Sequence, residues 1–147
     1  MRVLGLDLGK RRIGLAISDP EGRIAFPAGH LERVAIGRDL TALGTLIAER
    51  GVERAVVGLP LHLDGRAGPE AEAARAFATS LAERAGIPVE LLDERWTTVA
   101  AERSLHEMGP GTARRRGKGA VDAVAATLLL STYLDRLRLA SERGEAP

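Results

Sequence analysis

The stretch V-L-G-L-D-L-G-K-R-R-I-G-L-A-I-S-D, from Val3 to Asp19, decides the fold of this chain. Two apolar runs, Val3–Leu8 and Ile13–Ser18, flank a short Gly-Lys-Arg-Arg connection. Apolar runs of this length between turn formers are typical of buried β-strands, so the stretch predicts a β-hairpin. Asp7 interrupts the first run. A buried carboxylate is costly unless it is paired, hydrogen-bonded or bound to a metal ion, so Asp7 must have a partner.

The rest of the chain predicts alternating helices and strands. Asp19-Pro20-Glu21-Gly22 has the composition of a type I turn, and a third antiparallel strand should follow from about Arg23 to Gly29. A helix should follow, with Leu40, Leu43, Leu46 and Ile47 on one face and Gly51 as its cap, and then strands over Arg54–Leu59 and Pro88–Leu92. Between these strands we expect a helix over Glu70–Arg84 with Ala73, Phe77 and Leu81 on one face. A helix from Thr97 or Thr98 to about Met108 comes next, and a final helix runs from about Ala120 to Arg138, with a core face formed by Val121, Val124, Ala125, Leu128 and Leu129. This order predicts an α/β fold with a five-stranded mixed sheet, three antiparallel N-terminal strands followed by parallel ones, and helices on both faces.

Composition limits the class of protein. With 147 residues, 45% of them hydrophobic, the chain is expected to form a single domain over residues 1–147, with a frayed tail from about residue 141. No apolar run approaches the roughly 20 residues that span a bilayer, and no signal peptide is recognisable, so we expect a cytoplasmic protein. The absence of cysteine excludes thiolate catalysis and cysteine-ligated metals. A net charge of +1 means that a polyanionic partner would need local basic patches.

Acidic residues occur where the predicted strands end. Asp7 lies in the first strand, Asp93 and Glu94 directly follow the fifth, and Asp122 lies in the first turn of the final helix. Functional residues of open α/β sheets gather at the carboxyl ends of the strands, and carboxylates brought together there repel unless a cation lies among them. Oxygen ligands without a Cys or His pattern indicate Mg²⁺ or Mn²⁺, and two such ions about 3.5–4 Å apart serve phosphodiester hydrolysis.

Each of these acids also has a plainer interpretation. Asp7 could cap a turn beside Gly9, Asp122 could interact with the helix dipole, and the Asp93-Glu94 pair could form a solvated turn paired to Arg95. Their joint occurrence at one predicted sheet edge favours a common site.

Two basic runs lie beside these acids. Lys10, Arg11 and Arg12 follow Asp7 in the hairpin turn, and Arg114, Arg115, Arg116 and Lys118 precede Asp122. Such runs are usually solvated surface, but next to a metal site they suit a phosphate backbone. The glycine-rich segment 109–119 is expected to order over its substrate. His30, His62 and His106 have no ligand spacing, although His62 lies in a loop that should open on the same sheet edge.

Four motifs, in order along the chain, resemble one family. They are G-L-D-L-G-K-R-R-I-G-L-A-I-S-D-P (Gly5–Pro20), V-V-G-L-P (Val56–Pro60), D-E-R-W-T-T (Asp93–Thr98) and R-R-G-K-G-A-V-D-A-V-A-A (Arg115–Ala126). They resemble the YqgF family, also called RuvX, whose members have an RNase H-like fold and are described as Holliday junction resolvases or pre-16S rRNA nucleases.

The resemblance implies a site. The expected catalytic residues are Asp7, Asp93, Glu94 and Asp122, with Asp7, Glu94 and Asp122 as ligands of two Mg²⁺ or Mn²⁺ ions, and the expected substrate-binding residues are Lys10, Arg11, Arg12, Arg95, Arg114, Arg115, Arg116 and Lys118. Many relatives with this fold carry an acid at the end of strand four, where this chain has Gly58-Leu59-Pro60. The choice between Asp93 and Glu94 stays open, and the longer arm favours Glu94.

We therefore expect a metal-dependent endonuclease that acts on structured nucleic acid as a monomer or homodimer. The rival is a non-catalytic nucleic-acid-binding or ribosome-associated factor that retains the fold.

Overall fold

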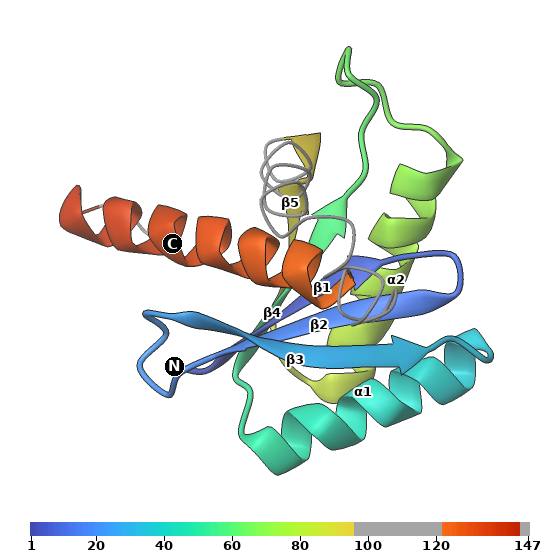
Figure 1. The fold of residues 1–147 in the computed structure, drawn as a ribbon, viewed down its shortest axis with the longest axis horizontal. Coiled ribbons are helices and arrows are strands. Elements are labelled where there is room, and N and C mark those ends of the chain that lie inside the picture. The colour runs from blue at the N-terminus through green and yellow to red at the C-terminus, as the bar shows by residue number, and fades with distance from the viewer. Residues whose placement is uncertain (96–121, 145–147) are drawn as a thin grey trace, which may run out of the picture.

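The computed structural model describes residues 1–95 and 122–144 of the chain (Figure 1). The strands are β1 (Val3–Leu8), β2 (Arg12–Ser18), β3 (Ala25–Glu32), β4 (Arg54–Leu59) and β5 (Val89–Asp93), and the helices are α1 (Ile36–Arg50), α2 (Pro69–Ala85) and a C-terminal helix described over residues 122–142. The sheet order is β3-β2-β1-β4-β5. Strand β2 is antiparallel to both β1 and β3, whereas β4 is parallel to both β1 and β5. The mixed sheet predicted from the sequence is confirmed.

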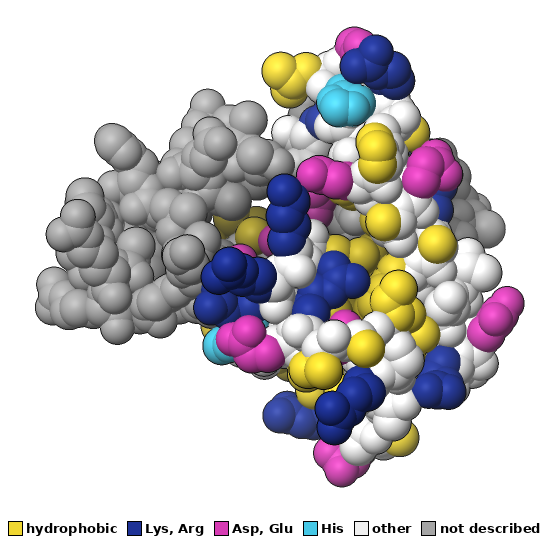
Figure 2. Space-filling view, turned by 90° about the vertical axis from the view of Figure 1, so that its right-hand side faces the viewer, with side chains coloured by type: hydrophobic (Ala, Val, Ile, Leu, Met, Phe, Trp, Pro, Cys, Tyr) yellow, Lys and Arg dark blue, Asp and Glu magenta, His cyan; other side chains and the backbone are white. Residues whose placement is uncertain are grey.

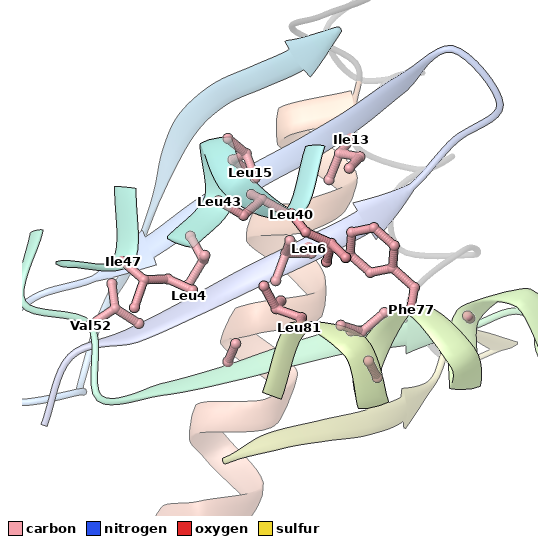
Figure 3. Packing of buried hydrophobic residues seen from close by; sticks show 14 of the residues in the cluster. Leu4, Leu6, Ile13, Leu15, Leu40, Leu43, Ile47, Val52, Phe77 and Leu81 are labelled. Atoms are coloured by element: carbon pink, nitrogen blue, oxygen red, sulfur yellow. The ribbon is translucent and has the colours of Figure 1, made fainter. Parts of the chain in front are cut away.

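Helices cover both faces of this sheet (Figure 1). Helices α1 and α2 pack on one face, where residues such as Leu4, Leu6, Leu43 and Leu81 form a first core (Figure 3). The C-terminal helix packs on the other face and forms a second core with the sheet. Its buried members are Val3, Ala16, Val56, Leu92, Ala126, Leu129, Leu130, Tyr133 and Leu134. Because side chains of a strand alternate between faces, each strand contributes to both cores.

Two helix faces differ from the predicted ones. In α2 the buried alanines are Ala71, Ala74 and Ala78, and Ala73 is exposed. In the C-terminal helix the buried residues are Ala123, Ala126, Leu129, Leu130, Tyr133 and Leu134, while Val124, Ala125 and Leu128 are only partly buried. Both segments carry small apolar residues all around the helix, so their spacing could not show which side of the helix faces the core.

Strand β3 begins later than predicted because the preceding turn is longer. The backbone N–H of Gly22 donates to the carbonyl of Asp19 at 3.0 Å, as a type I turn requires. The Asp19 side chain also accepts the backbone N–H groups of Arg23 (2.7 Å) and Ile24 (2.9 Å). These bonds hold residues 23 and 24 in the turn, and the strand continues to Glu32, which pairs with Arg12.

Some predictions fall on residues that the structure does not describe. These are the helix from Thr97 or Thr98 to Met108, the 109–119 segment with its basic residues, and the start of the final helix at Ala120. The final helix extends to residue 142, beyond the predicted end at Arg138, and residues 145–147 of the predicted frayed tail are also outside the described residues. Within the described part of the chain, no helix is long and apolar enough to cross a membrane.

Candidate metal and nucleic-acid site

Asp7 lies near the carboxyl end of β1, on the face that the C-terminal helix covers. Val3 belongs to the core on that face, and an added Cβ at Gly5 would lie 2.9 Å from Cβ of Leu130 in the C-terminal helix. By alternation Asp7 projects to the same side, where it is partly buried. Its partner across the antiparallel pair is Gly14 in β2. Asp7 thus lies in the middle of the sheet, between β2 and β4.

Glu94 reaches Asp7 from the end of β5, on the same face of the sheet. It follows β5 directly, and its backbone N–H donates to the carbonyl of Leu59 at the end of β4 at 3.1 Å. Burial, followed by a side-chain hydrogen bond with Asp7, raises the pKa of Glu94 to about 9. At neutral pH the pair therefore shares one proton between Glu94 and Asp7. The two acids form one hydrogen-bonded pair.

Asp122 approaches the pair from the C-terminal helix, whose first turn lies over the sheet (Figure 1). An added Cβ at Gly14 would overlap the carbonyl oxygen of Asp122 and lie 3.0 Å from its Cβ. Burial, followed by the negative charge of Asp7, raises the pKa of Asp122, while the charges of Arg12 and His30 act in the opposite direction. The structure therefore brings the first turn of this helix onto the strand pair that carries Asp7.

Asp93 has a different partner. Its carboxylate accepts bonds from Arg95 Nε at 2.9 Å and from Arg95 Nη2 at 2.6 Å, and these bonds lower the pKa of Asp93. Arg95 Nη1 donates in turn to the carbonyl of Leu63 at 3.2 Å. Of the two neighbouring acids, Glu94 is bonded to Asp7, whereas Asp93 and Arg95 fasten the loop after β4 to the end of β5.

A tight turn presents basic side chains beside Asp7. The backbone N–H of Gly9 donates to the carbonyl of Arg12 at 2.8 Å, which leaves Lys10 and Arg11 exposed at the tip. Arg33 braces the turn, because its Nη1 donates to the carbonyl of Gly9 and its backbone N–H to that of Arg11, both at 2.8 Å. The Arg33 guanidinium lies 5.8 Å from the centre of the Phe77 ring, which ties the turn to α2.

Arg12 is held by an acidic neighbour, since its Nε donates to Glu32 Oε1 at 2.9 Å. Figure 2 views the molecule from the side of the β1–β2 turn, and Lys and Arg side chains gather around the middle of this face with carboxylates between them. Arg114, Arg115, Arg116 and Lys118 lie outside the described residues.

The histidines have unequal positions. His62 lies in the loop after β4, where its Nε2 would be 2.6 Å from a Cβ added at Gly68, just before α2. His30 pairs with Gly14 across β2 and β3, and its Nε2 lies 3.5 Å from Glu32 Oε1. The sequence did not place His30 near Asp7, because only the register of β3 against β2 puts the two residues in one row across the sheet.

The donor atoms suit a hard divalent cation. Among residues 1–95 and 122–144, no group of three or more Asp, Glu or His side chains is arranged to hold a metal ion, so the described core of the site is the Asp7–Glu94 pair. Glycines flank this pair on both neighbouring strands, and a Cβ at Gly14 or Gly58 would fill the space of Asp122 or Glu94. Carboxylate oxygens are the ligands that Mg²⁺ and Mn²⁺ prefer.

Known proteins share both the sequence and the fold. Residues 1–136 match the RuvX family, which is described as a Holliday junction resolvase. A protein of Moorella thermoacetica named "Putative pre-16S rRNA nuclease" is 49% identical over 137 residues, which cover 93% of this chain and 96% of that protein. A protein of the same name from Myxococcus xanthus is 47% identical over 138 residues, covering 94% and 90% of the two chains.

Solved structures confirm the RNase H-like fold. The structure of Thermus thermophilus RuvC matches with a TM-score of 0.60 at 18% identity, covering 94% of this chain and 97% of that one. The Holliday junction resolvase of fowlpox virus matches with a TM-score of 0.58 at 12% identity, covering 93% of this chain and all of that one. At these identities the likeness concerns the fold alone. The sequence matches, which span nearly the whole chain, show that this protein belongs to the RuvX family.

Proposed function

We propose that this protein is a divalent-metal-dependent endonuclease that hydrolyses phosphodiester bonds in structured nucleic acid, either a pre-16S rRNA precursor or a four-way DNA junction. The observation that carries the proposal is the Asp7–Glu94 carboxyl pair, to which Asp122 is coupled by charge. Structural acids are usually paired with bases, whereas two acids that share a proton in a partly buried place are typical of a functional site. The names of the RuvX relatives support the same class of reaction.

Asp7, Glu94 and Asp122 would hold the metal ions. A bound divalent ion would supply Lewis-acid activation of the phosphodiester and of the attacking water. The chain prepares this site by holding Asp7 and Glu94 together at the ends of β1 and β5. Glu94 must lose its proton before it can act as a ligand, so metal binding would release a proton from the pair.

The basic residues would bind the phosphate backbone. Lys10 and Arg11 are exposed on the turn that Arg33 braces, close to Asp7 along the chain. Arg12 Nε is bonded to Glu32, so Arg12 would contact a phosphate through a guanidinium that also binds this carboxylate. The same holds for Arg95, which is bonded to Asp93. We assign Arg114, Arg115, Arg116 and Lys118 to substrate binding on their sequence position alone.

The test is cleavage of two substrates by the full chain. A four-way DNA junction and a precursor rRNA leader are incubated with the protein and either Mg²⁺ or Mn²⁺. We expect cleavage of at least one substrate, abolished by EDTA and reduced by about 10³-fold or more in Asp7→Asn. Asp135→Asn is the matched control, because Asp135 is exposed on the far part of the C-terminal helix.

The outcomes separate nuclease from binding factor. Cleavage by Asp7→Asn at the wild-type rate would contradict the proposal. Binding of both substrates without metal-dependent cleavage by the wild type would establish the rival, a nucleic-acid-binding or ribosome-associated factor.

A further inference from the structure

Gly58 lies under the side chain of Glu94. An added Cβ at residue 58 would overlap Oε1 of Glu94 and lie 2.7 Å from both its Cδ and its Cγ. A real Cβ at residue 58 could not lie this close to Glu94 unless one of the two side chains moved. The space that a side chain of residue 58 would fill is therefore the space that the Glu94 carboxyl group occupies.

The sheet explains why this space lies beside Asp7. Leu6 pairs with Val57 in parallel β1 and β4, so the next residues, Asp7 and Gly58, are neighbours across the two strands. Val56 belongs to the core under the C-terminal helix, and alternation places residue 58 on that same face. The carboxyl group of Glu94 reaches this place from β5 and there bonds to Asp7.

The backbone itself does not require glycine at this position. Gly58 is not among the glycines with positive φ, so an alanine could adopt its backbone conformation. The requirement is for space. Gly37 in α1 differs, since a Cβ added there would meet nothing within 4 Å.

We propose that Gly58 is a positioning residue that keeps the place beside Asp7 open for the Glu94 carboxyl group. We further infer that residues 58 and 94 are alternative positions from which one carboxylate can reach this place. The consequence for metal binding rests on the proposed function, whereas the steric part does not.

The first experiment is a double-mutant cycle on Mn²⁺ binding, measured by titration calorimetry on the full chain. Gly58→Ala should weaken Mn²⁺ binding by about 10- to 100-fold, as changes next to metal ligands do. Gly37→Ala, which adds the same methyl group in open space, should bind Mn²⁺ like the wild type. The double variant Gly58→Ala, Glu94→Ala should bind no more weakly than Glu94→Ala alone, since the methyl group acts only through Glu94. Wild-type affinity in Gly58→Ala, or losses that add in the double variant, would overturn the proposal.

The second experiment moves the carboxylate to β4. Gly58→Asp combined with Glu94→Ala should recover Mn²⁺ binding by about tenfold or more over Glu94→Ala alone. No recovery would refute the exchange of the two positions.

Metal-free unfolding separates this proposal from the proposed function. If the wild type binds no Mn²⁺, the metal-dependent function fails, but the packing can still be tested by thermal unfolding in EDTA. Gly58→Ala should lower Tm by about 3 °C or more when residue 94 is glutamate. The same change should lower Tm by much less in the Glu94→Ala background. Equal decreases in both backgrounds would overturn the steric argument. If Gly58→Ala does not fold, folding of the double variant supports the proposal and its failure to fold contradicts it.

Discussion

The protonated Glu94 makes the stability of this protein depend on pH in an unusual direction. Its pKa is about 9 in the folded protein, against 4.5 for an ordinary glutamate. Between these values the folded protein keeps a proton that the unfolded chain releases. The stability that this group contributes is therefore complete below pH 4.5 and is lost as the pH rises towards 9.

Replacing Glu94 by glutamine isolates this effect. The amide of Glu94→Gln can donate to Asp7 as the protonated acid does, but it does not titrate. The wild type and the variant should have similar stability near pH 4.5, and the wild type should lose about 1.4 kcal/mol relative to the variant for each further pH unit. At pH 7.5 the variant should then be more stable by up to about 4 kcal/mol.

Urea unfolding monitored by circular dichroism, in EDTA at several pH values from 5 to 8, measures this difference. Glu49→Gln is the matched control, because it makes the same change of side chain at an exposed residue of α1. A wild-type-minus-variant difference that is independent of pH, or a wild type that gains stability relative to Glu94→Gln as the pH rises, would refute the shared proton. Adding Mn²⁺ should reverse the order at pH 8, since the metal ion favours ionised Glu94.

Three further substitutions test the surroundings of the site. Gly14→Ala places a methyl group against the Asp122 carbonyl, so it should destabilise the protein by about 1–3 kcal/mol in urea unfolding and reduce cleavage. Arg33→Ala removes the brace of the β1–β2 turn and should weaken binding of a labelled four-way junction in fluorescence anisotropy, while far-UV circular dichroism stays unchanged. Tyr133→Phe removes the hydroxyl that accepts a bond from Arg54 at 3.3 Å, so it should cost about 1 kcal/mol of unfolding free energy without changing cleavage. Loss of cleavage in Tyr133→Phe would contradict the assignment of the site to the other end of the sheet.

Local patterns were sufficient for most of the secondary structure. Strands β1 and β4 have the predicted bounds. Helices α1 and α2 are capped by Gly51 and Gly86, whose φ values of 64° and 69° lie in the left-handed region that glycine favours. These features depend on residues close together in the chain, so the sequence carries them. The prediction that Ala73 lies on the buried face of α2 was wrong. In a helix built largely of alanine, the sequence does not show which side faces the core.

The order of residues along the chain is enough to show which residue types surround the site. An aspartate inside the apolar run of β1 and acids after β5 are present in the printed order, and the carboxyl ends of parallel strands must meet at one edge. Which acid bonds to Asp7 depends on the folded chain. Asp93 and Glu94 are adjacent and chemically alike, but successive side chains point in different directions, so one binds Arg95 and the other reaches Asp7. Because Gly58 has no side chain, the Glu94 carboxyl group has room beside Asp7, and no local sequence pattern reveals this.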